Sequence, residues 1–109
     1  PFVISAPTMR VPMTLKSTVS PYLATRAVLL LILYGRLQDG RPISEVVHTV
    51  AVPGMGTGVG GVSADTCARQ LRAAVDEMLL KTTDYPKSWQ EAEARHNTLA
   101  SDIWPKQRM

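Results

Sequence analysis

The pattern of hydrophobic and polar positions divides this chain into short apolar runs and longer stretches with helical spacing. Apolar runs at residues 2–6 and 46–52 are typical of buried strands, and the second is rich in valine and bounded by turn residues. Apolar residues recur at helical spacing over residues 22–34 and 67–79, and a further helix is predicted over residues 89–99. The order strand, helix, strand, helix predicts an α/β protein, because parallel strands are joined by crossover helices.

Polar residues mark where three helices are expected to begin. Ser20 followed by Pro21 is typical of an N-cap with proline at the first helical position. Ser63 can cap the helix after the second apolar run, with Asp65 in its first turn, where a negative charge suits the helix dipole. Ser88 can cap the last helix.

A glycine-rich loop lies between the valine-rich run and the helix that follows it. Glycine allows left-handed backbone and close approach of a ligand, so successive N–H groups can converge at the positive end of the helix. The natural occupant is a phosphate or diphosphate, and the alternative is a tight strand-to-helix turn without a ligand. Five glycines in eight positions are costly in chain entropy, which favours the anion site. The candidate ligand-binding residues of this loop are Gly54, Met55, Gly56, Thr57, Gly58, Val59, Gly60 and Gly61.

Two common nucleotide-binding folds do not fit this loop. Gly56, Gly58 and Gly61 formally satisfy G-x-G-x-x-G, but a dinucleotide fold also needs a strand after the helix. Residues 81–86, Lys-Thr-Thr-Asp-Tyr-Pro, do not have the pattern of a buried strand. No G-K-[ST] follows the glycines, which excludes a P-loop ATPase or kinase.

The loop and its flanking elements resemble the second ligand loop of macro domains, which are ADP-ribose-binding modules. Residues 57–61, Thr-Gly-Val-Gly-Gly, match the family pattern T-G-[IV]-aromatic-G except that Gly60 stands in place of the aromatic residue. Residues 2–7 resemble the preceding strand, which in the family ends in a small residue and proline, and residues 22–34 resemble the crossover helix. The resemblance covers about residues 2–81 and corresponds to the C-terminal portion of a macro domain.

The resemblance implies a three-layer α/β/α sheet, of which this chain supplies about two strands and three helices. Residues 1–109 then form a single domain, the C-terminal half of a macro-like domain. Because two strands do not form a stable sheet alone, the remaining strands are expected from an N-terminal half or from a second copy of the chain. The isolated chain is therefore expected to be oligomeric or poorly folded.

The function implied by the resemblance is binding of ADP-ribose or a related nucleotide diphosphate through the strand, loop and helix. Pro7 and Thr8, at the end of the first predicted strand, are expected beside the ligand. Hydrolysis of an ADP-ribose derivative, of the ADP-ribose-1''-phosphatase or O-acetyl-ADP-ribose deacetylase type, stays open. The alternative is a structural or assembly protein that keeps the fold without the ligand, which Gly60 and the absence of the family's earlier loop favour. No catalytic residue is assigned, and neither a metal nor a cofactor is expected.

Composition and individual residues narrow the choice of ligand, location and chemistry. A formal charge of +3 favours an anionic ligand, whereas the twelve Lys and Arg residues are too scattered to indicate nucleic-acid binding. The single cysteine, Cys67, is expected in the core and indicates a reducing, cytoplasmic location. His48 and His96 are expected to be structural or surface residues, since neither has a visible catalytic or metal-binding companion. The apolar runs are too short to predict a membrane span.

Overall fold

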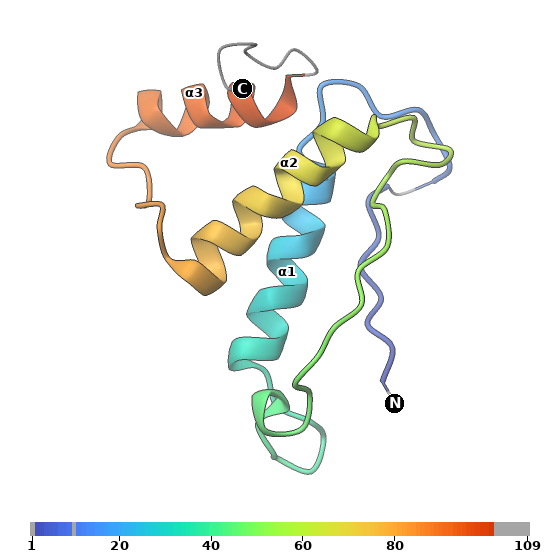
Figure 1. Ribbon diagram of the computed structural model, residues 1–109, viewed down its shortest axis with the longest axis vertical. Coiled ribbons are helices and arrows are strands. Elements are labelled where there is room, and N and C mark those ends of the chain that lie inside the picture. The colour runs from blue at the N-terminus through green and yellow to red at the C-terminus, as the bar shows by residue number, and fades with distance from the viewer. Residues whose placement is uncertain (1, 10, 102–109) are drawn as a thin grey trace.

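Helices alone make up the regular structure of the computed structural model, which describes residues 2–9 and 11–101. The three main helices are α1, Ser20–Tyr34, α2, Ala64–Val75, and α3, Trp89–Ala100 (Figure 1). A short 3-10 turn, η1, spans Ile43–Glu45, and a π-helical turn, η2, Asp76–Leu80, continues α2. No helix of the described residues is long and apolar enough to cross a membrane.

Helix α1 begins one residue earlier than expected. Ser20 is its first residue, Val19 is the N-cap, and Pro21 lies in the first turn, where its missing N–H costs nothing. The hydroxyl of Thr18 accepts the N–H of Ser20 at 3.0 Å and so supplies the bond that a cap side chain would make. The prediction that Ser20 itself caps the helix was wrong by one position.

The serine caps predicted for the two later helices are confirmed. The Ser63 hydroxyl accepts the N–H of Thr66 at 3.1 Å, three residues into α2. The Ser88 hydroxyl accepts the N–H of Glu91 at 3.1 Å at the start of α3. Helix η2 ends at Leu80, and the next residue, Lys81, takes the left-handed conformation (φ 54°) usual for the residue after a helix.

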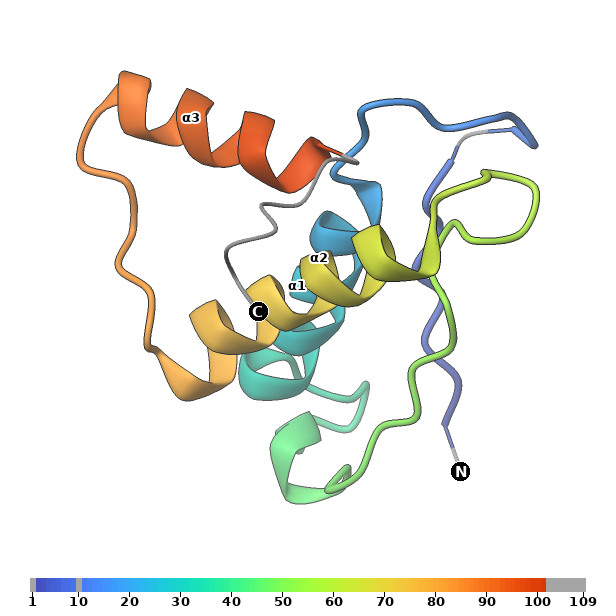
Figure 2. The ribbon, with the colours of Figure 1, turned by 45° about the horizontal axis from the view of Figure 1, so that its top comes forward.

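The core lies where α1 and α2 cross, and α3 packs on α2 beside this crossing (Figures 1 and 2). Gln70 is fully buried at the centre of this core. Its side chain makes hydrogen bonds to three backbone groups, which belong to α1, to the segment before α1 and to α3. The amide nitrogen donates to the carbonyls of Thr18 and Leu99, and the amide oxygen accepts the N–H of Tyr22. The buried hydrophobic residues in the described part of the chain are Ala24, Val28, Ile43, Val62, Cys67, Ala74, Met78 and Ala100.

The two predicted strands are extended but do not form a sheet, so the predicted three-layer α/β/α fold is contradicted. Residues 2–6 and 46–52 run side by side in the same direction (Figures 1 and 2), yet no backbone hydrogen bond joins them in the part of the chain described here. The isolated bridge in this part of the chain joins Arg36 and Pro42 across the turn after α1. A buried strand needs covered side chains and a paired backbone, and neither condition is met, because these residues are exposed or half-buried and the two segments share no backbone hydrogen bond.

Candidate functional site

The glycine-rich loop forms a closed turn immediately before α2. The N–H of Val62 donates to the carbonyl of Gly56 at 3.0 Å, and the N–H of Gly61 donates to Gly58 at 3.1 Å. Gly56 (φ 70°) and Gly61 (φ 72°) take left-handed conformations that other residues rarely adopt. Two of the loop's glycines are thus required by the backbone path alone.

Gly60 is required by packing, which explains its place in a position that is aromatic in macro domains. A Cβ at Gly60 would lie 2.6 Å from the carbonyl oxygen of Gly56 and about as close to the side chains of Leu15 and Met9 as heavy atoms can come. Its carbonyl accepts the N–H of Leu15 at 2.8 Å. Here the loop is held by the 9–15 segment, and a ring at position 60 has no space.

The tip of the loop is different, because it is open. Thr57, Gly58 and Val59 are exposed, and their backbone N–H groups have no hydrogen-bond acceptor among the described residues. A Cβ at Gly58 would meet no atom within 4 Å, and Gly58 does not take a left-handed conformation. These three donors can therefore reach an external oxyanion, and neither packing nor the backbone path explains why position 58 is glycine.

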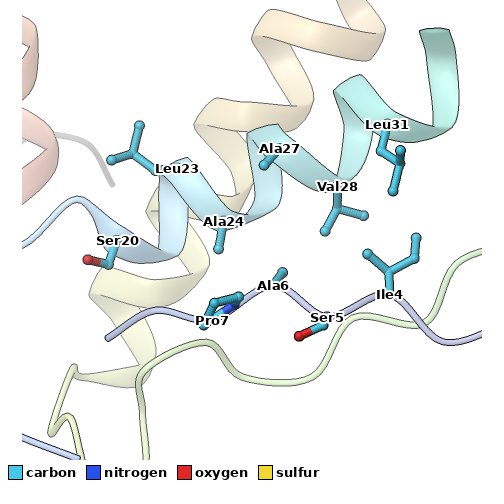
Figure 3. Close-up of a pocket in the computed structure, with 10 residues that line it drawn as sticks. All are labelled: Ile4, Ser5, Ala6, Pro7, Ser20, Leu23, Ala24, Ala27, Val28 and Leu31. Carbon is cyan, nitrogen blue, oxygen red and sulfur yellow. The ribbon is translucent and has the colours of Figure 1, made fainter. Parts of the chain in front are cut away.

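The two other predicted site residues, Pro7 and Thr8, face different parts of the molecule. The Thr8 hydroxyl lies 3.8 Å from the position of a Cβ on Gly56, so the structure brings Thr8 against the loop. Pro7 instead lines a cavity of about 390 Å³ between residues 4–7 and one face of α1 (Figure 3). The cavity's other walls are mainly apolar, including Leu23, Val28 and Leu31 of α1, and they offer an anion no positive charge.

The base of the loop has a structural role. The N–H of Met55 donates to the sulfur of Cys67 at 3.3 Å, which fastens the start of the loop to α2. Cys67 is buried, as expected for a core cysteine. A Cβ at Gly54 would lie 2.6 Å from the hydroxyl of Thr57, an exposed side chain that can rotate away, so packing constrains Gly54 less than Gly60. Of the predicted loop residues, 57–59 are therefore the ones available to a ligand.

No catalytic or metal-binding cluster accompanies the loop in the described part of the chain. His48 is exposed on the wall of a cavity of about 720 Å³ between the two extended segments, whose other lining residues are mostly apolar. No group of three or more His, Cys, Asp or Glu side chains is placed to hold a metal ion within residues 2–9 and 11–101. His96 is exposed on α3, in agreement with a surface residue.

The sequence analysis missed a buried ionic cluster around Glu77. Its carboxylate accepts the Tyr22 hydroxyl at 2.6 Å, the Arg26 Nε at 2.8 Å and an Arg95 Nη at 2.5 Å. Arg95 reaches across from α3 to Glu77 on η2. The spacing carried a signal, because Glu77 lies seven residues after Gln70 and so falls on the same buried face of the helix.

The cluster shifts the pKa values of Glu77 and Tyr22. Burial alone would raise the pKa of Glu77, but hydrogen bonds from Tyr22 and Arg26 and the charges of both arginines hold that pKa below its ordinary value. Burial, and then the hydrogen bond to Glu77, raise the pKa of Tyr22 to about 12. Glu77 is therefore a carboxylate and Tyr22 a neutral hydrogen-bond donor at neutral pH.

Comparison with known proteins gives no relative for this chain. No protein-family model matches the sequence, and neither a curated protein sequence nor a solved structure shows significant similarity to it.

Proposed function

We propose that the chain binds a nucleoside diphosphate, with ADP-ribose as the first candidate, at the tip of the glycine-rich loop. The observation that carries this proposal is that three consecutive exposed residues, Thr57, Gly58 and Val59, have backbone N–H groups without an acceptor within the described structure. Successive backbone N–H groups of a loop can bind phosphate oxygens. ADP-ribose is the candidate because residues 57–61 resemble a macro-domain ligand loop.

Three neighbouring features support the assignment to an anion. The loop leads directly into α2, whose N-terminus carries partial positive charge. Ser63 satisfies only the Thr66 N–H of the helix's first turn with its cap oxygen, and the net charge of the chain is +3. Thr8 adds a hydroxyl beside the loop. These groups bind oxygen atoms without supplying an acid or a base, so the proposal concerns binding and not hydrolysis.

Calorimetric titration of the whole chain with ADP-ribose, ADP, AMP and adenosine tests this proposal. Binding is expected for the two diphosphates and is expected to be weaker by about tenfold or more for AMP and adenosine, because a lost charge-assisted hydrogen bond costs about 1.5–3 kcal/mol. No heat from ADP-ribose at millimolar concentration would contradict the proposal. Equal affinity for ADP and ADP-ribose would leave a generic diphosphate site.

The variant Gly58→Val separates a ligand loop from a simple turn. The added side chain meets open space, so the melting temperature is expected to stay within a few degrees of the parent chain. It would nevertheless block close approach to the loop, and ADP-ribose affinity is expected to fall at least tenfold. Ala94→Val, which adds two methyl groups on the exposed face of α3, serves as the control. Unchanged affinity in Gly58→Val would show that the loop is only a turn.

A second candidate function, assembly through a second copy of the chain, rests on the extended segments. Residues 2–6 and 46–52 expose apolar side chains, including Phe2, Val3 and Val52. The N–H groups of Val46 and Val47 donate to the carbonyl of Ile43, whereas the backbone groups of residues 2–6 and 48–52 have no partner among the described residues. Extended backbone of this kind accepts another strand by edge-to-edge pairing. Sedimentation velocity over a hundredfold range of concentration would show a monomer–dimer equilibrium if this is correct, and a single monomeric species if it is not.

A further inference from the structure

A second cavity lies between the start of α1, the turn that follows η2, and α3, on the other side of the helical core from the extended segments. Its volume is about 390 Å³, within the range of small-ligand sites. Its ionisable residues are Arg26 on α1, Glu77 on η2, and Arg95 and His96 on α3, together with two tyrosines. Its apolar walls are Val19, Leu23, Pro86, Ala92 and Leu99.

The charged groups of this cavity are arranged in layers. The Glu77 side chain is only 3% exposed, whereas those of Arg26 and Arg95 are 30% and 23% exposed. The carboxylate therefore lies at the floor, and the two guanidinium groups lie nearer the opening. With one glutamate facing two arginines, the cluster has a net charge of +1 before His96 is considered.

Each arginine uses only part of its donor set on the protein. Arg26 donates through Nε to Glu77, and its side chain also interacts with the Tyr85 hydroxyl. Arg95 donates through Nη2 to Glu77 and, at 3.4 Å, through Nη1 to the carbonyl of Asp84. A guanidinium carries five N–H groups in a fixed fork that matches carboxylate and phosphate oxygens. Each side chain is thus held in place by Glu77 and retains donors for a second oxyanion.

We propose that this cavity binds a small organic anion in which one carboxylate or phosphate group is attached to an apolar ring or chain. The oxyanion would bind to Arg26 and Arg95 where their charge exceeds that of Glu77, and the imidazole of His96 lies on the same wall. The apolar body would pack on Leu23, Pro86 and Leu99.

The probes are phenyl phosphate, benzoate, inorganic phosphate and phenol, each titrated into the whole chain and followed by NMR of backbone and arginine Nε–H signals. Phenyl phosphate or benzoate is expected to shift the signals of Arg26, Arg95 and His96 with saturation, and their relative affinities identify the preferred oxyanion. Inorganic phosphate and phenol, which each lack one half of the ligand, are expected to bind at least tenfold more weakly. Absence of saturable shifts at these residues for both aromatic anions would overturn the proposal.

Glu77→Gln distinguishes a binding site from a structural cluster. The substitution keeps the side-chain shape and removes the negative charge, so aromatic-anion affinity is expected to rise several-fold even if stability falls. Unchanged or weaker binding by a folded Glu77→Gln chain would contradict the proposal.

Two further variants make the test independent of that one substitution. Arg26→Lys keeps the charge but loses the fork, and its aromatic-anion affinity is expected to fall about tenfold, whereas an unchanged affinity would count against the site. Arg41→Gln, which removes an exposed arginine paired with Asp39 on the surface, is the control and is expected to leave affinity unchanged.

Discussion

The helical core and the pair of extended segments both contain apolar stretches of sequence, yet only the core satisfies its own backbone. Where α1 and α2 cross, the buried Gln70 side chain makes hydrogen bonds to three backbone groups at or near the ends of α1 and α3. In the extended pair, residues 2–6 and 46–52 lie side by side without a backbone hydrogen bond between them in the part of the chain that the structure describes. Apolar side chains cover the core but remain exposed on the pair.

The difference shows that apolar content does not decide which segments become regular structure. A helix bonds its backbone within itself, so α1 and α2 need only one apolar face to pack. An extended segment depends on a neighbour at the correct distance and register for every bond. The helical core is thus the region that should respond strongly to single substitutions, and the extended pair should respond weakly in the monomer.

The largest expected effect is at Gln70. Gln70→Ala would leave the carbonyls of Thr18 and Leu99 and the N–H of Tyr22 without their partners in a buried site, and it would open a cavity. We expect a loss of about 3 kcal/mol in the free energy of unfolding, measured by urea denaturation. Gln90→Ala, at an exposed position of α3, is the matched control and is expected to change it by less than about 0.5 kcal/mol. Equal effects would mean that the buried amide does not stabilise the core.

The helices could be predicted from the sequence because their signals are local. Apolar spacing located all three, and Ser63 and Ser88 were confirmed as caps because a cap bond needs only the next three residues. The sheet was wrongly predicted because strand pairing depends on distant backbone that an apolar run does not specify. Of the candidate site, the glycines at 56 and 61 follow from the turn, whereas the role of Gly60 depends on contacts with Met9 and Leu15. The Glu77 cluster joins three elements, so spacing could indicate that Glu77 is buried but not what it bonds.

The second-largest expected effect is a loss of stability at acidic pH, caused by protonation of Glu77. The pKa of this carboxyl is lower in the folded chain than its ordinary value of 4.5, so its contribution is present above about pH 4.5 and is lost as the pH falls through the folded-state pKa. We expect the free energy of unfolding to decrease over this acidic range. Glu77→Gln should be less stable at neutral pH and should show a weaker dependence on pH below 4.5. A parent chain and a Glu77→Gln chain with parallel pH profiles would contradict the cluster's role.

The smallest expected effect is in the extended pair, and it becomes informative beside a matched substitution in the core. Val28 is 6% exposed and Val3 is 98% exposed, so the same change to alanine removes the same atoms from opposite environments. Val28→Ala is expected to cost about 1–2 kcal/mol, and Val3→Ala less than about 0.5 kcal/mol, in urea denaturation of the monomer. At high protein concentration the two predictions separate further. If a second copy covers the extended pair, Val3→Ala should weaken the dimer measured by sedimentation while leaving monomer stability unchanged. A loss of monomer stability as large as that of Val28→Ala would mean that the extended segment is already packed within one chain, and the contrast between the two regions would not hold.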